Sequence, residues 1–212
     1  MKTHPIDRDI LLRLPKTDLH VHLDGSMRVE TVIDIAKKKG VELPSTDPAE
    51  LLKYVQMSES CESLEEYLRA FDITCSVLQD FESLRRAAFE LAEDAATENV
   101  KYMEVRFCPL LHTNEGLSLE KIVKAVLIGL ADAERQYDIT TGVIICGIRH
   151  MSPESSDKLA DLTIAFKNRG VVAFDLAGTE YDNPAKYHRE AFHKILNKNI
   201  NCTIHAGEAF GP

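Results

Sequence analysis

The sequence predicts an α/β protein, a (β/α)8 TIM-type barrel of which these 212 residues supply about the first five strands. Short runs rich in Val, Ile and Phe alternate with helical segments, which is typical of βα units and a parallel sheet. Histidine, arginine and acidic residues stand at or just after the ends of the predicted strands. Because a barrel gathers such residues around one mouth, we favour it over a doubly wound sheet, which usually carries a GxGxxG loop that is absent here.

The first half of the chain predicts one strand followed by helices. Leu19–Leu23 is apolar apart from its two histidines and reads as the first strand. Helical spacing of apolar residues predicts a helix over Met27–Lys39, ended by Gly40, a usual C-terminal signal. The charged, periodic stretch 48–99 is nearly free of breakers and predicts several consecutive helices, inserted after the first strand.

The second half alternates strand and helix. Lys101–Phe107 alternates in polarity and is closed by Pro109, and Pro153 with Ser152 as a cap starts a later helix. In chain order the expected strands and helices are Lys101–Phe107, Leu119–Tyr137, Thr140–Ile148, Pro153–Asn168, Val171–Leu176, Pro184–Asn197 and Asn201–His205.

Composition excludes several classes of protein. The formal net charge is -9, from 34 acidic and 25 basic residues, which argues against a general nucleic-acid surface. The five cysteines are odd in number and form no CxxC pair, so reduced thiols are expected rather than a disulfide framework or a Cys-rich zinc knuckle. We find no apolar signal segment near the N-terminus and no 18-residue apolar run, so we expect a cytoplasmic protein without a membrane span.

Two histidines in the first predicted strand are candidate metal ligands. His20 and His22 are two positions apart, so on a strand their side chains point to the same face and can share an ion. Two ordinary half-buried histidines are the alternative for an isolated HxH. The position at a strand end, followed by Asp24 and Gly25, favours the ligand pair.

A second signal ends the last predicted strand. His205 can supply a third nitrogen ligand, and Glu208 follows past a glycine that permits a sharp turn. A carboxylate at that position can face the metal without binding it. A structural histidine and a solvated glutamate remain the alternative for these two residues taken alone.

Five motifs in one order make the sequence resemble the zinc-dependent adenosine deaminases of the amidohydrolase superfamily. They are LPKTDLHVHLDGS (Leu14–Ser26), YMEVRFCP (Tyr102–Pro109), CGIRH (Cys146–His150), VVAFDLAGTE (Val171–Glu180) and TIHAGE (Thr203–Glu208). The resemblance runs through nearly the whole chain.

The resemblance implies a role for each matching residue. His20, His22 and His205 would bind one zinc ion, with His22 also contacting the substrate. Asp24 would accept a hydrogen bond from the ribose 5′-hydroxyl, and Gly178 would place backbone against the purine. A protonated Glu208, made neutral by burial beside the purine, would donate to N1, while zinc-activated water attacks C6 of adenosine or 2′-deoxyadenosine and ammonia leaves.

Two further groups of residues surround this set. We expect a supporting role, the orientation of ligands and strand ends, for Arg106, Arg149, His150 and Asp175. An apolar helical stripe in the insertion can wall the purine, with an ordinary core face as the alternative; it consists of Leu64, Tyr67, Leu68 and Phe71.

Sister families narrow the prediction. The resembling adenine deaminases tend to have glutamate where Asp24 stands, which favours the nucleoside here. Binuclear amidohydrolases use a lysine near the fourth strand, and 174–178 contains none, so one zinc is expected, although other divalent ions can substitute. The absence of PCxxC excludes the cytidine-type deaminase fold. Deaminases of methylated adenosine nucleotides remain an alternative.

The family pattern continues beyond Pro212 with a histidine that works with the zinc-bound water and with an Asp–Asp pair that completes the zinc shell. The sequence is therefore expected to be one piece of a split enzyme with a second polypeptide, the first part of a longer protein, or a truncation. Five strands do not close an eight-stranded barrel. The expected function is an enzyme once the barrel is complete, or else a non-catalytic half-barrel, and isolated 1–212 is expected to be inactive.

Overall fold

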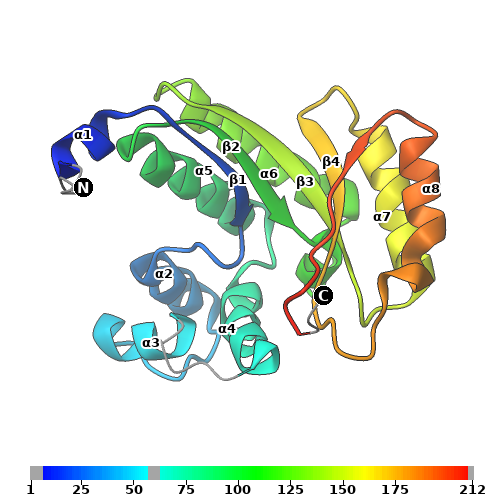
Figure 1. Ribbon diagram of the computed structural model, residues 1–212. Helices are drawn as coiled ribbons and strands as arrows, with labels where there is room; N and C mark the ends of the chain where they lie inside the picture. The colour runs from blue at the N-terminus through cyan, green and yellow to red at the C-terminus, as the bar shows by residue number, and fades with distance from the viewer. Residues whose placement is uncertain (1–6, 57–62, 210–212) are drawn as a thin grey trace, which may run out of the picture.

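The computed structural model describes residues 7–56 and 63–209 and has a five-stranded parallel sheet (Figure 1). Its strand order, β1-β2-β3-β4-β5, follows the sequence without reversal. A doubly wound sheet reverses direction at a switch point, whereas a barrel adds each strand beside the previous one, so the order is that of a barrel. The strands are β1 Lys16–His22, β2 Val100–Phe107, β3 Thr140–Ile148, β4 Val171–Ala177 and β5 Asn201–Cys202.

Burial distinguishes the central strands from the edges. β3 is buried throughout 142–148, as expected for a parallel strand covered on both faces, and its sequence is a nearly continuous apolar run. β1 lies at one edge and its side chains are exposed or only half-buried. Parallel register aligns the strand ends: His22 pairs with Arg106 on β2, and Cys146 on β3 pairs with Asp175 on β4. Side chains from the carboxyl ends of β1, β2, β3 and β4 therefore lie together at one end of the sheet.

Four helices form an outer layer along one face of the sheet (Figure 1). α5 and α6 approach so closely that a Cβ on Gly129 would lie 2.1 Å from the carbonyl oxygen of Arg85, and Arg85 pairs with Asp132 at 2.6 Å. The buried apolar stripes of these helices face the strands. The layer consists of α5 Phe81–Thr97, α6 Leu119–Glu134, α7 Pro153–Ala165 and α8 Arg189–Leu196.

Three other helices gather at the carboxyl ends of the strands, below the sheet in Figure 1. They are α2 Val29–Lys39, α3 Pro48–Val55 and α4 Leu64–Val77. The expected helical insertion, 48–99, included α5, but the structure places α5 in the outer layer because its apolar face packs on β2 and α6. The group over the strand ends is therefore α2, α3 and α4. No helix in the described ranges is long and apolar enough to cross a bilayer.

Several boundaries differ from the sequence-based expectation. β1 begins three residues early, at Lys16, because its backbone already pairs with Val100. The expected strand over Asn201–His205 is shorter in the structure, although the amides of Thr203 and His205 still donate to carbonyls of β4. The expected helix over Pro184–Asn197 is divided into a 3-10 turn, η2 Ala185–His188, and α8. Two short elements were not expected, α1 Arg8–Arg13 and η1 Pro109–His112.

Candidate active site and metal centre

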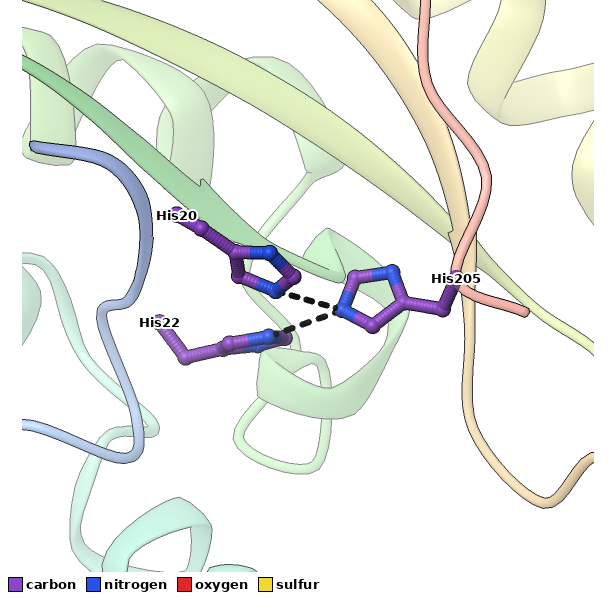
Figure 2. Close-up of side chains that lie close together, drawn as sticks. All are labelled: His20, His22 and His205. Carbon is purple, nitrogen blue, oxygen red and sulfur yellow. Dashed lines mark hydrogen bonds between the residues drawn. The ribbon is translucent and has the colours of Figure 1, made fainter. Parts of the chain in front are cut away.

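Three imidazoles converge at the carboxyl end of the sheet (Figure 2). Nε2 of His205 lies 2.8 Å from Nε2 of His20 and 3.2 Å from Nε2 of His22. His20 and His22 point the same way from β1, as strand alternation predicts, and His205 reaches them from the segment after β5. The His205 side chain is buried, that of His22 is half-buried and that of His20 is exposed.

The chemistry of these donors fits a cation. Nδ1 of His205 lies 2.9 Å from the Asp175 carboxylate, so this nitrogen holds the ring proton and Nε2 presents a lone pair. One lone pair cannot accept two good hydrogen bonds from the other two rings. Three nitrogens around a tetrahedral zinc lie about 3.3 Å apart when each bond is about 2.0–2.1 Å, which is close to the observed separations.

Burial prepares two of the rings to bind a metal. The pKa of His22 is lowered to about 4, first by burial and then by the neighbouring His205 and His20. Burial also lowers the pKa of His20, assisted by Arg106. Neutral imidazole is the form that coordinates metals, so these two rings need not lose a proton at neutral pH.

Asp175 and Arg106 form a buried support behind the three histidines. Oδ2 of Asp175 lies 2.9 Å from a guanidinium nitrogen of Arg106, whose other terminal nitrogen donates to the Leu19 carbonyl at 2.7 Å. Burial alone would raise the pKa of Asp175, but the hydrogen bond from His205 and the charge of Arg106 hold it below its usual range. A charged Asp175 thus orients His205 and ties β1, β2 and β4 together.

A second buried arginine supports the loop that carries Glu208. Arg149 donates to the carbonyl of His205 and, at 3.0 Å, to the carbonyl of Asn183. The carboxylate of Glu180 accepts hydrogen bonds from the amides of Gly207, Glu208 and Ala209 at 3.1, 2.8 and 2.9 Å. Glu180 was not singled out from the sequence, although it is the last residue of the VVAFDLAGTE motif.

A pocket of about 950 Å³ opens beside the three histidines. α4 contributes Leu64, Leu68 and Phe71, three residues of the apolar stripe, to its wall. The Phe71 ring lies edge-on to His22, with 5.9 Å between ring centroids. The side chain of Tyr67 lies outside the described residues. The pocket is therefore apolar on the α4 side and polar at the strand ends.

The other expected substrate residues line the same pocket, together with His150. Asp24 is almost completely buried. Gly178 has a φ of 89°, and a Cβ there would lie 2.9 Å from the Ile148 side chain, so only glycine brings backbone this close to the pocket without strain. Glu208 is exposed. The described chain thus does not bury the Glu208 carboxyl, and a purine bound beside this carboxyl would have to bury it.

Two residues that the sequence analysis missed lie beside Asp24. Cys75 Sγ and His112 Nε2 are 3.7 and 3.8 Å from Oδ2 of Asp24. They come from α4 and η1, which are far apart in sequence, so no local pattern could have found them. Cys146 was likewise missed, and its thiol lies 3.4 Å from Asp175.

Comparison with known proteins identifies related sequences over nearly the whole chain. The family model described as adenosine deaminase matches residues 15–212. A probable adenosine deaminase of Dictyostelium discoideum is 47% identical over 203 residues, which are 96% of this chain and 26% of that protein. The adenosine deaminase of Clostridium botulinum strain 657 is 47% identical over 198 residues, which are 93% of this chain and 60% of that protein. The chain thus spans about a quarter of the first relative and less than two thirds of the second.

A solved structure shows the same fold. The apo N6-methyl-AMP deaminase from Arabidopsis thaliana matches with a TM-score of 0.80 and 27% identity, over 96% of this chain and 61% of that one. The structural relatives are TIM-barrel deaminases, which confirms the predicted barrel class. The five described strands form only part of that barrel.

Proposed function

Because this chain belongs to the adenosine deaminase family, we propose that, within a complete barrel, it hydrolyses adenosine or 2′-deoxyadenosine to the inosine nucleoside and ammonia. One observation carries the proposal: three imidazole nitrogens converge beside a pocket that Glu208 and Asp24 also line. That donor set suits a single zinc ion, which supplies an activated water at neutral pH when it is bound.

The residues of this chain provide the remaining chemistry. Protonated Glu208 donates to purine N1, which draws electrons from C6 and makes that carbon easier for water to attack. Asp24 accepts a hydrogen bond from the ribose 5′-hydroxyl, and backbone at Gly178 lies against the purine. Leu64, Leu68 and Phe71 cover the base and exclude bulk water. Water adds its oxygen at C6, and the amino group leaves as ammonia.

The lining of the pocket favours a nucleoside over a nucleotide. Among the described residues around it there is no lysine or arginine, whereas Asp24 and Asp72 both contribute carboxylates. Against these described residues, a phosphate would meet negative charge without a cation to pair with. Free adenine would leave Asp24, a buried acceptor, without the hydroxyl it is placed to receive. Adenosine and 2′-deoxyadenosine fit both conditions.

The test compares three substrates on the protein with its barrel complete. We expect deamination of adenosine with a kcat/KM at least about 100-fold above the values for adenine and N6-methyl-AMP, because an unpaired buried acceptor or charge costs about 3 kcal/mol. Preference for N6-methyl-AMP would contradict the nucleoside assignment. No turnover of any substrate, with zinc bound and the barrel complete, would favour the non-catalytic alternative.

A further inference from the structure

Outside the histidine triad, three different metal-binding side chains meet beside the pocket. Asp24 follows β1, Cys75 lies in α4 and His112 ends η1. Oδ2 of Asp24 is 3.7 Å from Cys75 Sγ and 3.8 Å from His112 Nε2, and donor atoms of all three lie within 4.8 Å of one another. Asp24 and Cys75 line the pocket, so an ion can reach them from solvent.

Two acceptor atoms of this cluster have no hydrogen-bond donor opposite them among the described residues. Nδ1 of His112 donates to the Leu78 carbonyl at 2.9 Å, so Nε2 of the neutral ring carries a lone pair directed at the Asp24 carboxylate. Among the described side chains, His112 Nε2 and Asp24 Oδ1 are fully buried atoms without a hydrogen-bond partner. His112 and Asp24 do not share a hydrogen bond, because the 3.8 Å between Nε2 and Oδ2 is too long for one.

We propose that Asp24, Cys75 and His112 form a second metal site, for a thiophilic divalent cation such as Zn²⁺ or Cd²⁺, distinct from the histidine triad. A thiolate, an imidazole and a carboxylate are a mixed donor set that zinc accepts. Around a tetrahedral zinc, such donors lie about 3.3–3.6 Å apart, so the two distances from Asp24 Oδ2 need only a small contraction. The open side toward the pocket leaves room for water as a further ligand.

The second site is weaker than the triad because the metal must displace a proton. Cysteine binds metals as a thiolate, so each ion that enters releases one proton from Cys75 to solvent. Burial and the nearby Asp24 raise the pKa of this thiol well above its usual range. The cluster therefore fills only after the triad, when the metal is in excess.

Occupation of the second site has a consequence for catalysis that rests on the proposed function. An ion there holds the Asp24 carboxylate, which the ribose 5′-hydroxyl would otherwise engage. Excess Cd²⁺ or Zn²⁺ should then raise KM for adenosine in proportion to occupancy. Metal binding is measured without this activity, so the proposed second metal site and the proposed deamination can each fail without the other.

The experiment titrates Cd²⁺ into the complete protein, which first receives one equivalent of zinc. Bound cadmium is counted by equilibrium dialysis, and its bond to Cys75 is followed by the near-ultraviolet sulfur-to-cadmium charge-transfer absorbance. We expect a second equivalent that carries this absorbance. The variant Cys75→Ser should lose the absorbance and bind the second equivalent at least about 10-fold more weakly, and His112→Leu should weaken it similarly.

The matched control is Cys202→Ser, since Cys202 is another half-buried free thiol but lies on β5, away from the cluster. It should keep both the second equivalent and the absorbance. Circular dichroism melting of each variant checks that it is folded, and the small Cys75→Ser change guards against failure of His112→Leu to fold. Absorbance that survives Cys75→Ser, or saturation of the wild type at one ion, would overturn the proposal; the second result would mean that the cluster holds only water.

Discussion

Nδ1 of His205 lies 2.9 Å from Oδ2 of Asp175, whose side chain has no exposed surface. The same oxygen faces Arg106 at 2.9 Å, so one carboxylate orients a proposed zinc ligand and neutralises a buried arginine. Because the carboxylate fixes the proton on Nδ1, Nε2 stays free for the metal. The metal centre therefore depends on a residue that the metal does not touch.

Replacing Asp175 should weaken metal binding without removing a ligand. Asp175→Asn keeps the shape of the side chain but loses its charge and can leave His205 in the wrong tautomer, so zinc affinity should fall about 10–100-fold. Competition with a chromophoric zinc chelator measures this change. The control Asp72→Asn removes an exposed carboxylate of the same pocket and should leave the affinity unchanged. Equal affinities for wild type and Asp175→Asn would contradict the assigned role.

Glu180 should position the loop of Glu208 rather than bind substrate. Glu180→Gln has only one oxygen to accept hydrogen bonds from Gly207, Glu208 and Ala209, so at least one amide loses its partner. Hydrogen exchange at these amides should accelerate, and kcat should fall about 10-fold while zinc affinity stays constant. The exposed Glu190→Gln on α8 is the matched control. A variant with normal exchange and normal kcat would show that the loop holds its position without Glu180.

His112 should make the protein less stable as the pH falls. Burial lowers its pKa from 6.5 to about 4, although the hydrogen bond to Leu78 acts in the opposite direction. Below pH 6.5 His112 binds a proton in the unfolded chain but stays neutral in the folded chain, so the free energy of unfolding falls between about pH 6.5 and 4. The difference between the two pKa values corresponds to a total loss of about 3 kcal/mol, of which about 2 kcal/mol is lost by pH 5.

Urea unfolding at pH 7.5 and pH 5, in the presence of chelator, measures this effect in wild type and His112→Leu. The leucine variant should lose about 2 kcal/mol less over that interval. Burial raises the pKa of Asp24 to about 6, and this shift acts in the opposite sense in both proteins. Parallel pH profiles for the two proteins would contradict a buried, neutral His112.

Local patterns in the sequence predicted the elements that a single periodicity defines. The spacing of His20 and His22 placed both rings on one strand face, and Gly40 ends α2 with a φ of 69° as a C-terminal signal should. Ser152 caps α7, with Pro153 in its first turn. These features depend on neighbours within a few residues, which the sequence displays directly.

Tertiary relationships were harder to predict. α5 is amphipathic like α3 and α4, and its packing on β2 and α6 separates it from them. The approach of Cys75 and His112 to Asp24 joins three segments that share no local motif. The exposure of Glu208 depends on what covers the strand ends, which no periodicity encodes. Such features follow from the assembled fold and could not be derived from spacing.

The most direct test of the central claim is ammonia release from adenosine by the protein with a complete barrel and one equivalent of zinc, measured beside Glu208→Gln. Glutamine cannot supply the proton for N1, so the variant should keep its zinc while kcat falls about 100- to 10,000-fold. Rapid ammonia release by wild type and almost none by the zinc-loaded variant is the result we predict. Equal release by both proteins, or none by zinc-loaded wild type, would contradict the assignment of this site to adenosine deamination.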